Sequence, residues 1–139
     1  MVLREAGETQ KCLSQQHWDG TLYVAIGIPK AGITSTKISK WDGSKWSELG
    51  PEIKGDVYYL ATGPKGTLYA VGHSYSGTTK SSIQCVTKWN GSEWSNVKIP
   101  EDAQKALQNI ALAVGPDGTL YAAFTTAKHC FVAKWNGSN

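Results

Sequence analysis

The chain has 139 residues, a mass of 15.0 kDa and a formal net charge of +3, which suits one globular domain. A hydrophobic content of 40% without any long apolar run excludes a membrane-spanning helix. The basic residues are scattered, which argues against a nucleic-acid partner. Met1 to Glu5 lack the apolar stretch of a signal peptide, so we expect either a cytoplasmic protein or one that has lost a leader, and the compartment stays open.

Two short motifs recur three times along the chain. Gly-Thr-Leu-Tyr begins at Gly20, Gly66 and Gly118, and Lys-Trp-(Asp/Asn)-Gly-Ser begins at Lys40, Lys88 and Lys134. The intervals are 46 and 52 residues for the first motif, and 48 and 46 for the second. A fixed period of this size is typical of repeat architectures, so we predict three tandem units.

The sequence pattern of each unit predicts four short antiparallel strands. In the second unit, an apolar strand at Val57 to Thr62 is followed by a Gly-Pro-Lys-Gly turn and a strand at Thr67 to Gly72. A third strand ends at Lys-Trp, and Asp/Asn-Gly makes a tight turn into a fourth strand that opens with Trp46 or Trp94. The third unit repeats this pattern at Ile110 to Val114 and Thr119 to Phe124. One such meander cannot bury both faces alone, so the units are expected to stack.

Two segments depart from the pattern. The first strand of unit one, Leu13 to His17, is polar where its counterparts are apolar. Glu101 to Leu107 is the single helix candidate.

The repeats resemble the kelch-like β-propeller repeats of bacterial proteins, whose blades combine an apolar strand, a Gly-x-x-Gly turn, Leu-Tyr-x-x-Gly and Lys-Trp-Asp-Gly-Ser-x-Trp. The resemblance covers residues 11 to 139. It implies an all-β fold, a β-propeller of four-stranded antiparallel blades with three blades per chain, and it leaves a secreted or cell-surface origin open. It says little about function, because this fold hosts enzymes, lectins and protein-interaction platforms alike.

Three blades do not close a ring, since propellers have about 4 to 8. We expect one half-propeller over 1–139, with blades at about 8–54, 55–103 and 104–139, the last of which lacks its fourth strand. Joining the chain end to its start aligns Gln10-Lys11 with Gln104-Lys105 within one residue, so residues 1–7 are expected to supply that strand. A homodimer would then form a six-bladed ring. The alternative is a piece of a longer propeller.

Five tryptophans recur at two positions of the unit, so packing between blades explains them without a ligand. They are Trp41, Trp46, Trp89, Trp94 and Trp135. Trp18 is different, because it stands in a turn where the other units carry Pro-Lys or Pro-Asp. We therefore treat Trp18 as a candidate binding residue.

The residues expected of a catalytic or metal site do not form a pattern. Cys12, Cys85 and Cys130 are odd in number and lack metal-site spacing, so we expect buried free thiols. The three histidines are scattered, and no nucleophile elbow or phosphate loop occurs. Asp19, Asp42 and Asp117 are expected to form turns. We predict no enzyme activity, no cofactor and no metal.

The units differ most in the loops between their second and third strands, and binding residues concentrate in loops on a rigid scaffold. Candidate ligand-binding residues in or beside these loops are Lys30, His73, Tyr75 and Lys80. Gln15 and His17 are further candidates, because they lie in the polar first strand of unit one and the innermost strand of a propeller blade lines the central channel. The leading interpretation is a non-enzymatic binding module for a glycan or a protein, the glycan being implied by likeness to oligomeric propeller lectins. The alternative is a structural or interaction repeat without a small-molecule site, and a hydrolase or lyase is disfavoured.

Overall fold

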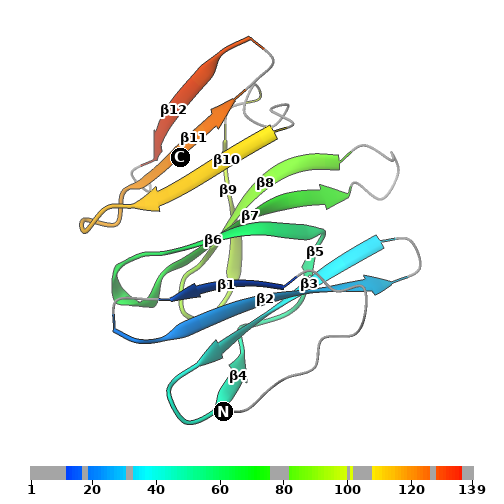
Figure 1. Cartoon of the computed structure of the whole chain (residues 1–139), viewed down its shortest axis with the longest axis vertical. Helices are drawn as coiled ribbons and strands as arrows, with labels where there is room; N and C mark the ends of the chain where they lie inside the picture. The colour runs from blue at the N-terminus through cyan, green and yellow to red at the C-terminus, as the bar shows by residue number, and fades with distance from the viewer. Residues whose placement is uncertain are drawn as a thin grey trace.

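The structure is a computed structural model that describes residues 12–16, 19–30, 33–75, 82–99, 101, 108–125 and 128–135. Of residues 12–16, 30, 33, 75, 82–83 and 108–110, only the backbone is described. The predicted all-β fold is confirmed: the described residues form strands in three antiparallel sheets (Figure 1). Within these ranges, no helix is long and apolar enough to cross a membrane. The predicted helix and the N-terminal strand lie, except for Glu101, outside the described residues.

The first sheet has the order β1-β2-β3-β4, with the short β5 paired to β3. Its strands are β1 (Cys12–Gln16), β2 (Leu22–Lys30), β3 (Ile33–Trp41), β4 (Trp46–Glu48) and β5 (Ile53–Lys54).

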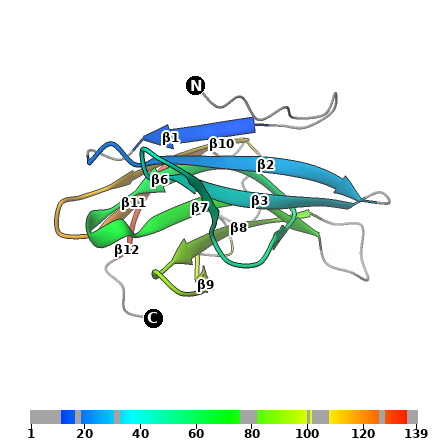
Figure 2. The ribbon, with the colours of Figure 1, turned by 90° about the horizontal axis from the view of Figure 1, so that it is seen from below.

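The middle and third sheets repeat this meander. The middle sheet contains β6 (Asp56–Thr62), β7 (Leu68–Tyr75), β8 (Ser82–Trp89) and β9 (Trp94–Val97), in that order. The third contains β10 (Gln108–Val114), β11 (Leu120–Thr125) and β12 (Cys130–Trp135). The sheets follow one another like a fan in Figure 1, and in Figure 2 the first strand of each sheet, β1, β6 or β10, lies above the strands that follow it in that sheet. β6 contacts both β1 and β10.

The turns have the chemistry that the sequence predicts. The Asp42 carboxylate accepts hydrogen bonds from the backbone N–H groups of Ser44 and Lys45, each at 2.9 Å, and Asn90 makes the same contacts in the middle sheet. Asp19 and Asp117 each accept a bond from the backbone N–H two residues later. These bonds satisfy backbone donors locally, which confirms the aspartates as turn residues.

Each sheet has two apolar faces that carry equivalent residues. What we call the Tyr face holds the tyrosine of Gly-Thr-Leu-Tyr and its neighbours: Tyr23, Ala25 and Ile38 in the first sheet, Tyr69, Val71 and Val86 in the middle, and Tyr121, Ala123 and Val132 in the third. The opposite Leu-Trp face holds Leu22, Val24 and Trp41, then Leu68, Ala70 and Trp89, then Leu120, Ala122 and Trp135.

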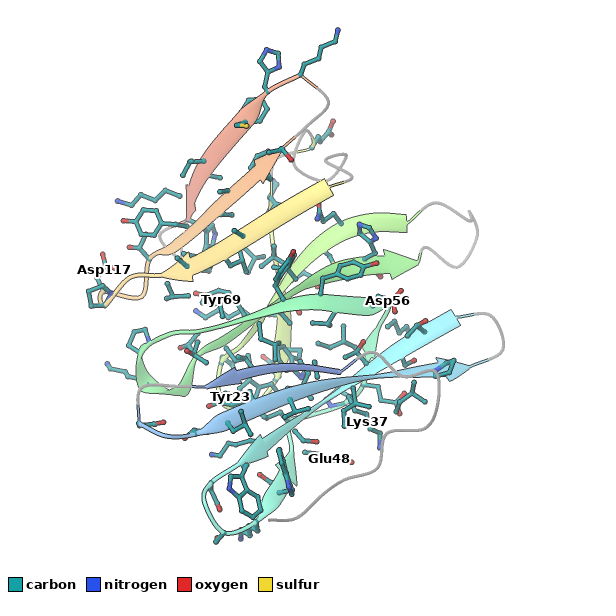
Figure 3. All side chains as sticks on the ribbon, viewed as in Figure 1. Tyr23, Lys37, Glu48, Asp56, Tyr69 and Asp117 are labelled. Atoms are coloured by element: carbon teal, nitrogen blue, oxygen red, sulfur yellow. The ribbon has the colours of Figure 1, made fainter. Side chains whose placement is uncertain are left out.

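Two cores hold the sheets together. In the first core, the Tyr face of the first sheet packs against the Leu-Trp face of the middle sheet, with Tyr23 and Trp89 among its buried residues. In the second core, the Tyr face of the middle sheet packs against the Leu-Trp face of the third, where Tyr69 meets Trp135 edge-on at 6.3 Å between ring centroids. Tyr23 and Tyr69 are labelled in Figure 3. The same pair of faces therefore meets twice within one chain.

Burial differs from the sequence expectation at two kinds of residue. Cys130 is a free cysteine but is exposed, so the expectation of a buried thiol is wrong there, because β12 is an edge strand in the described part of the chain; Cys85 is half-buried. Trp89 is buried, whereas Trp41, Trp46, Trp94 and Trp135 are half-buried. Trp41 lies on the face of the first sheet against which no described sheet packs.

Candidate functional site

A cleft of about 260 Å³ opens between the first and middle sheets. One wall is the segment 51–54, which includes β5, and the other is formed by β7, β8 and β9. The lining residues are Pro51, Glu52, Ile53, Lys54, Ser74, Cys85, Thr87, Trp94 and Asn96. This volume lies just below the ~300–1,000 Å³ usual for pockets that hold drug-sized ligands, so the cleft suits a small molecule.

Trp94 is held firmly at the edge of this cleft. Its indole N–H donates a hydrogen bond across the sheet boundary to the Leu49 carbonyl at 2.8 Å. The centroid of its ring lies 5.2 Å from the ring centroid of Trp89. Gly50 makes this arrangement possible: it has φ +65°, and a Cβ there would come within 2.6 Å of Trp89 Cζ3 and 3.2 Å of Trp94 Cδ1. The half-buried indole ring thus has one orientation before any ligand arrives.

The passage from the first to the middle sheet depends on a close backbone approach. Gly55 has φ +121°, and a Cβ there would collide with the carbonyl of His73. On the other side, the Thr36 hydroxyl donates a buried hydrogen bond to the Gly55 carbonyl at 2.8 Å. This crossing fixes the position of β5 against β7, and with it the width of the cleft.

The polar groups of the cleft suit binding better than covalent chemistry. Burial raises the pKa of the Cys85 thiol, which a hydrogen bond with the Ser74 backbone only partly offsets, so the thiol stays protonated at neutral pH and is a poor nucleophile. The Thr87 hydroxyl donates to the Ala70 carbonyl at 3.4 Å, which leaves its oxygen able to accept. Asn96 is exposed and offers both donors and an acceptor. Among the described residues, no cluster of His, Cys, Asp or Glu could hold a metal ion.

The residues that the sequence nominated are only partly described. The half-buried His73 has its ring Nδ1 3.2 Å from the Tyr58 hydroxyl, and its side chain does not line the cleft, although its neighbour Ser74 does. Tyr75 and Lys30 end β7 and β2, and Gln15 lies in β1, each described by backbone alone. Lys80, His17 and Trp18 lie outside the described residues.

No known protein-family model matches the chain, and a search of curated proteins finds no significant match. The functional interpretation therefore rests on the geometry of the chain and on the pattern of its repeats.

None of the ligand-binding candidates that the sequence predicts is among the described residues that line the cleft. The repeat explains Trp94 by packing alone, and it predicts no role for Pro51 to Lys54. One signal was present: Pro-Glu follows the fourth strand in both of the first two units, two residues after Leu49 and three after Val97. Such a recurrence marks the segment as part of the repeat, but it does not reveal which strands of the next sheet the segment faces.

Proposed function

We propose that the three sheets are blades of a β-propeller and that the chain is a non-enzymatic, lectin-like binding module whose ligand occupies the cleft beside Trp94. The observation that supports this proposal most is the cleft itself, in which an oriented aromatic ring stands beside neutral polar side chains on β7, β8 and β9 and faces the charged Glu52 and Lys54 on the opposite wall. Two chains would form a six-bladed ring. The placement of β6 against both β1 and β10 supports the blade interpretation, because the first strands of blades adjoin around a propeller's centre.

The chemistry of the cleft favours a small polyhydroxylated ligand such as a monosaccharide unit of a glycan. A pyranose ring presents hydroxyl groups, which match the amide of Asn96 and the hydroxyls of Thr87 and Ser74. It also presents apolar C–H faces, which match the exposed part of the Trp94 ring. Few polar groups at fixed positions beside an apolar surface are the usual composition of a small-molecule site.

Asn96→Ala is the first test, with binding measured on a glycan array and then by calorimetry with the best free sugar. Loss of one ligand hydrogen bond, about 0.5–1.5 kcal/mol, should weaken binding roughly 2- to 10-fold without changing thermal stability, since Asn96 is exposed. Ser95→Ala is the matched control, because Ser95 is also exposed but points to the opposite face of β9.

Two outcomes would count against the cleft. If Tyr75→Ala or Lys80→Ala abolishes binding while Asn96→Ala does not, the site lies in the loops between second and third strands. If no glycan binds at all, the chain is better explained as a structural or interaction repeat.

A further inference from the structure

Equivalent residues on the Tyr faces of the middle and third sheets have opposite environments. Tyr69 and Val86 are 1% and 2% exposed, because the third sheet covers them. Their counterparts Tyr121 and Val132 are 39% and 77% exposed. The third sheet therefore presents to solvent an apolar face whose copies elsewhere in the chain are core.

The first sheet shows the complementary situation on its Leu-Trp face. The counterparts of this face are buried in the two cores, where Leu68 is fully buried and Leu120 nearly so. Leu22, Val24 and Trp41 are only half-buried, and no described sheet packs against them. Within the part of the chain that the structure describes, one half of the repeated junction is thus left without a partner face on the first sheet and the other half on the third sheet.

On the exposed Tyr face of the third sheet, Lys134 is placed as Lys88 is placed in the formed junction between the middle and third sheets. Lys88 Nζ lies over the Tyr69 ring at 5.9 Å and over the Trp135 ring at 5.4 Å, so the lysine bridges the two rings of a formed junction. Lys134 Nζ lies over the Tyr121 ring at 6.0 Å in the same way. Among the described residues, no tryptophan from a neighbouring sheet completes that arrangement. The residue equivalent to Trp135 on the open face of the first sheet is Trp41.

We propose that a second copy of this chain docks here, with the Tyr face of the third sheet packed on the Leu-Trp face of the partner's first sheet. Trp41 of the partner subunit then meets Tyr121 and Lys134 as Trp135 meets Tyr69 and Lys88. Two-fold symmetry forms this junction twice and leaves neither face open. The inference deepens the proposed propeller assembly by naming the surfaces, and it does not depend on the ligand, since the cleft lies within one chain.

Light scattering on the full chain and on two face variants tests the proposal. The wild type should have twice the 15.0 kDa mass of one chain. Val132→Asp should be monomeric and folded, because Val132 is exposed within the chain and a buried charge would weaken the junction at least ~30-fold. Val24→Lys should also be monomeric; if it fails to fold by circular dichroism, Val24→Gln replaces it.

Mixing the two variants gives the decisive measurement. Because the damaged faces differ, a mixed dimer keeps one intact junction, and its second junction contains the introduced carboxylate of one chain and the introduced ammonium group of the other, which have opposite charges. The mixture should therefore regain the doubled mass.

Val132→Thr is the control, because threonine has nearly the shape of valine and no charge, so this variant should stay dimeric. A wild-type mass other than twice that of the chain, variants that remain dimeric, or a mixture that stays monomeric would each overturn the proposal. Binding to the cleft, measured in parallel on the monomeric variants, reports separately on the proposed function.

Discussion

The middle sheet and the third sheet are built from the same repeated pattern, yet one is core on both faces and the other on one face only. In the middle sheet, Tyr69 and Trp89 lie on opposite faces and both are buried. In the third, Trp135 packs inward while Tyr121 on the other face is exposed. A residue's place in the repeat therefore sets the direction in which its side chain points. Whether that side chain is buried depends on a neighbouring sheet.

The largest effect should come from comparing Trp89→Ala with Trp41→Ala. Trp89 is buried in the first core, so its truncation should lower the free energy of unfolding by ~3–5 kcal/mol at every protein concentration. Trp41 occupies the same position of the repeat on an open face, so its truncation should cost less than half as much in dilute protein. Urea denaturation at several protein concentrations measures the loss of unfolding free energy for both variants. The loss for Trp41→Ala should grow with protein concentration if a second copy covers Trp41. Equal costs in dilute protein would contradict the difference between the faces.

Gly50→Ala tests how tightly the first and middle sheets pack where they meet, in contrast to a glycine in an open turn. A Cβ at Gly50 meets the rings of Trp89 and Trp94, and the residue has φ +65°, so overpacking and backbone strain should together cost ~2–4 kcal/mol. Gly66→Ala is the control, because Gly66 has a similar φ of +72° but nothing lies within 4 Å of its added Cβ. Thermal unfolding should show a clearly larger loss for Gly50→Ala than for Gly66→Ala. Equal losses would mean that the indoles move aside freely.

The smallest effect is expected at a turn remote from both cores, where the first sheet has Asp42 and the middle sheet Asn90. Hydrogen bonds from the Lys45 backbone, then from Ser44, lower the pKa of Asp42 to about 2. Because this folded-state pKa lies below the unfolded value near 3.9, the stabilisation is present above about pH 4 and is lost as pH falls towards 2.

Asp42→Asn copies the turn of the middle sheet and should keep neutral-pH stability while removing this acid dependence. The difference in denaturation midpoint between wild type and variant, followed from pH 5 to pH 2, measures it. A difference that does not change with pH would show that the carboxylate contributes nothing through its ionisation.

Most strands and turns of the described fold could be predicted from the sequence, because their causes are local. Val57 to Thr62 and Thr67 to Gly72 were predicted as strands, and the structure places β6 and β7 there. The turn aspartates were predicted from side-chain chemistry that acts within three residues. The propeller ring remains a prediction, since ring closure involves surfaces beyond one chain.

The candidate cleft and the open faces were decided by tertiary structure alone. Glu52 and Asn96 are 44 positions apart, and they line one cleft because the first sheet packs on the middle one through Trp89 and Leu49. The exposure of Cys130 likewise reflects an edge position that no local pattern encodes. Sequence determined the repeat, its turns and the two faces of each sheet, because backbone preference and side-chain alternation act over a few residues. Only the packing of whole sheets decided which of those faces are core, because burial depends on what lies opposite.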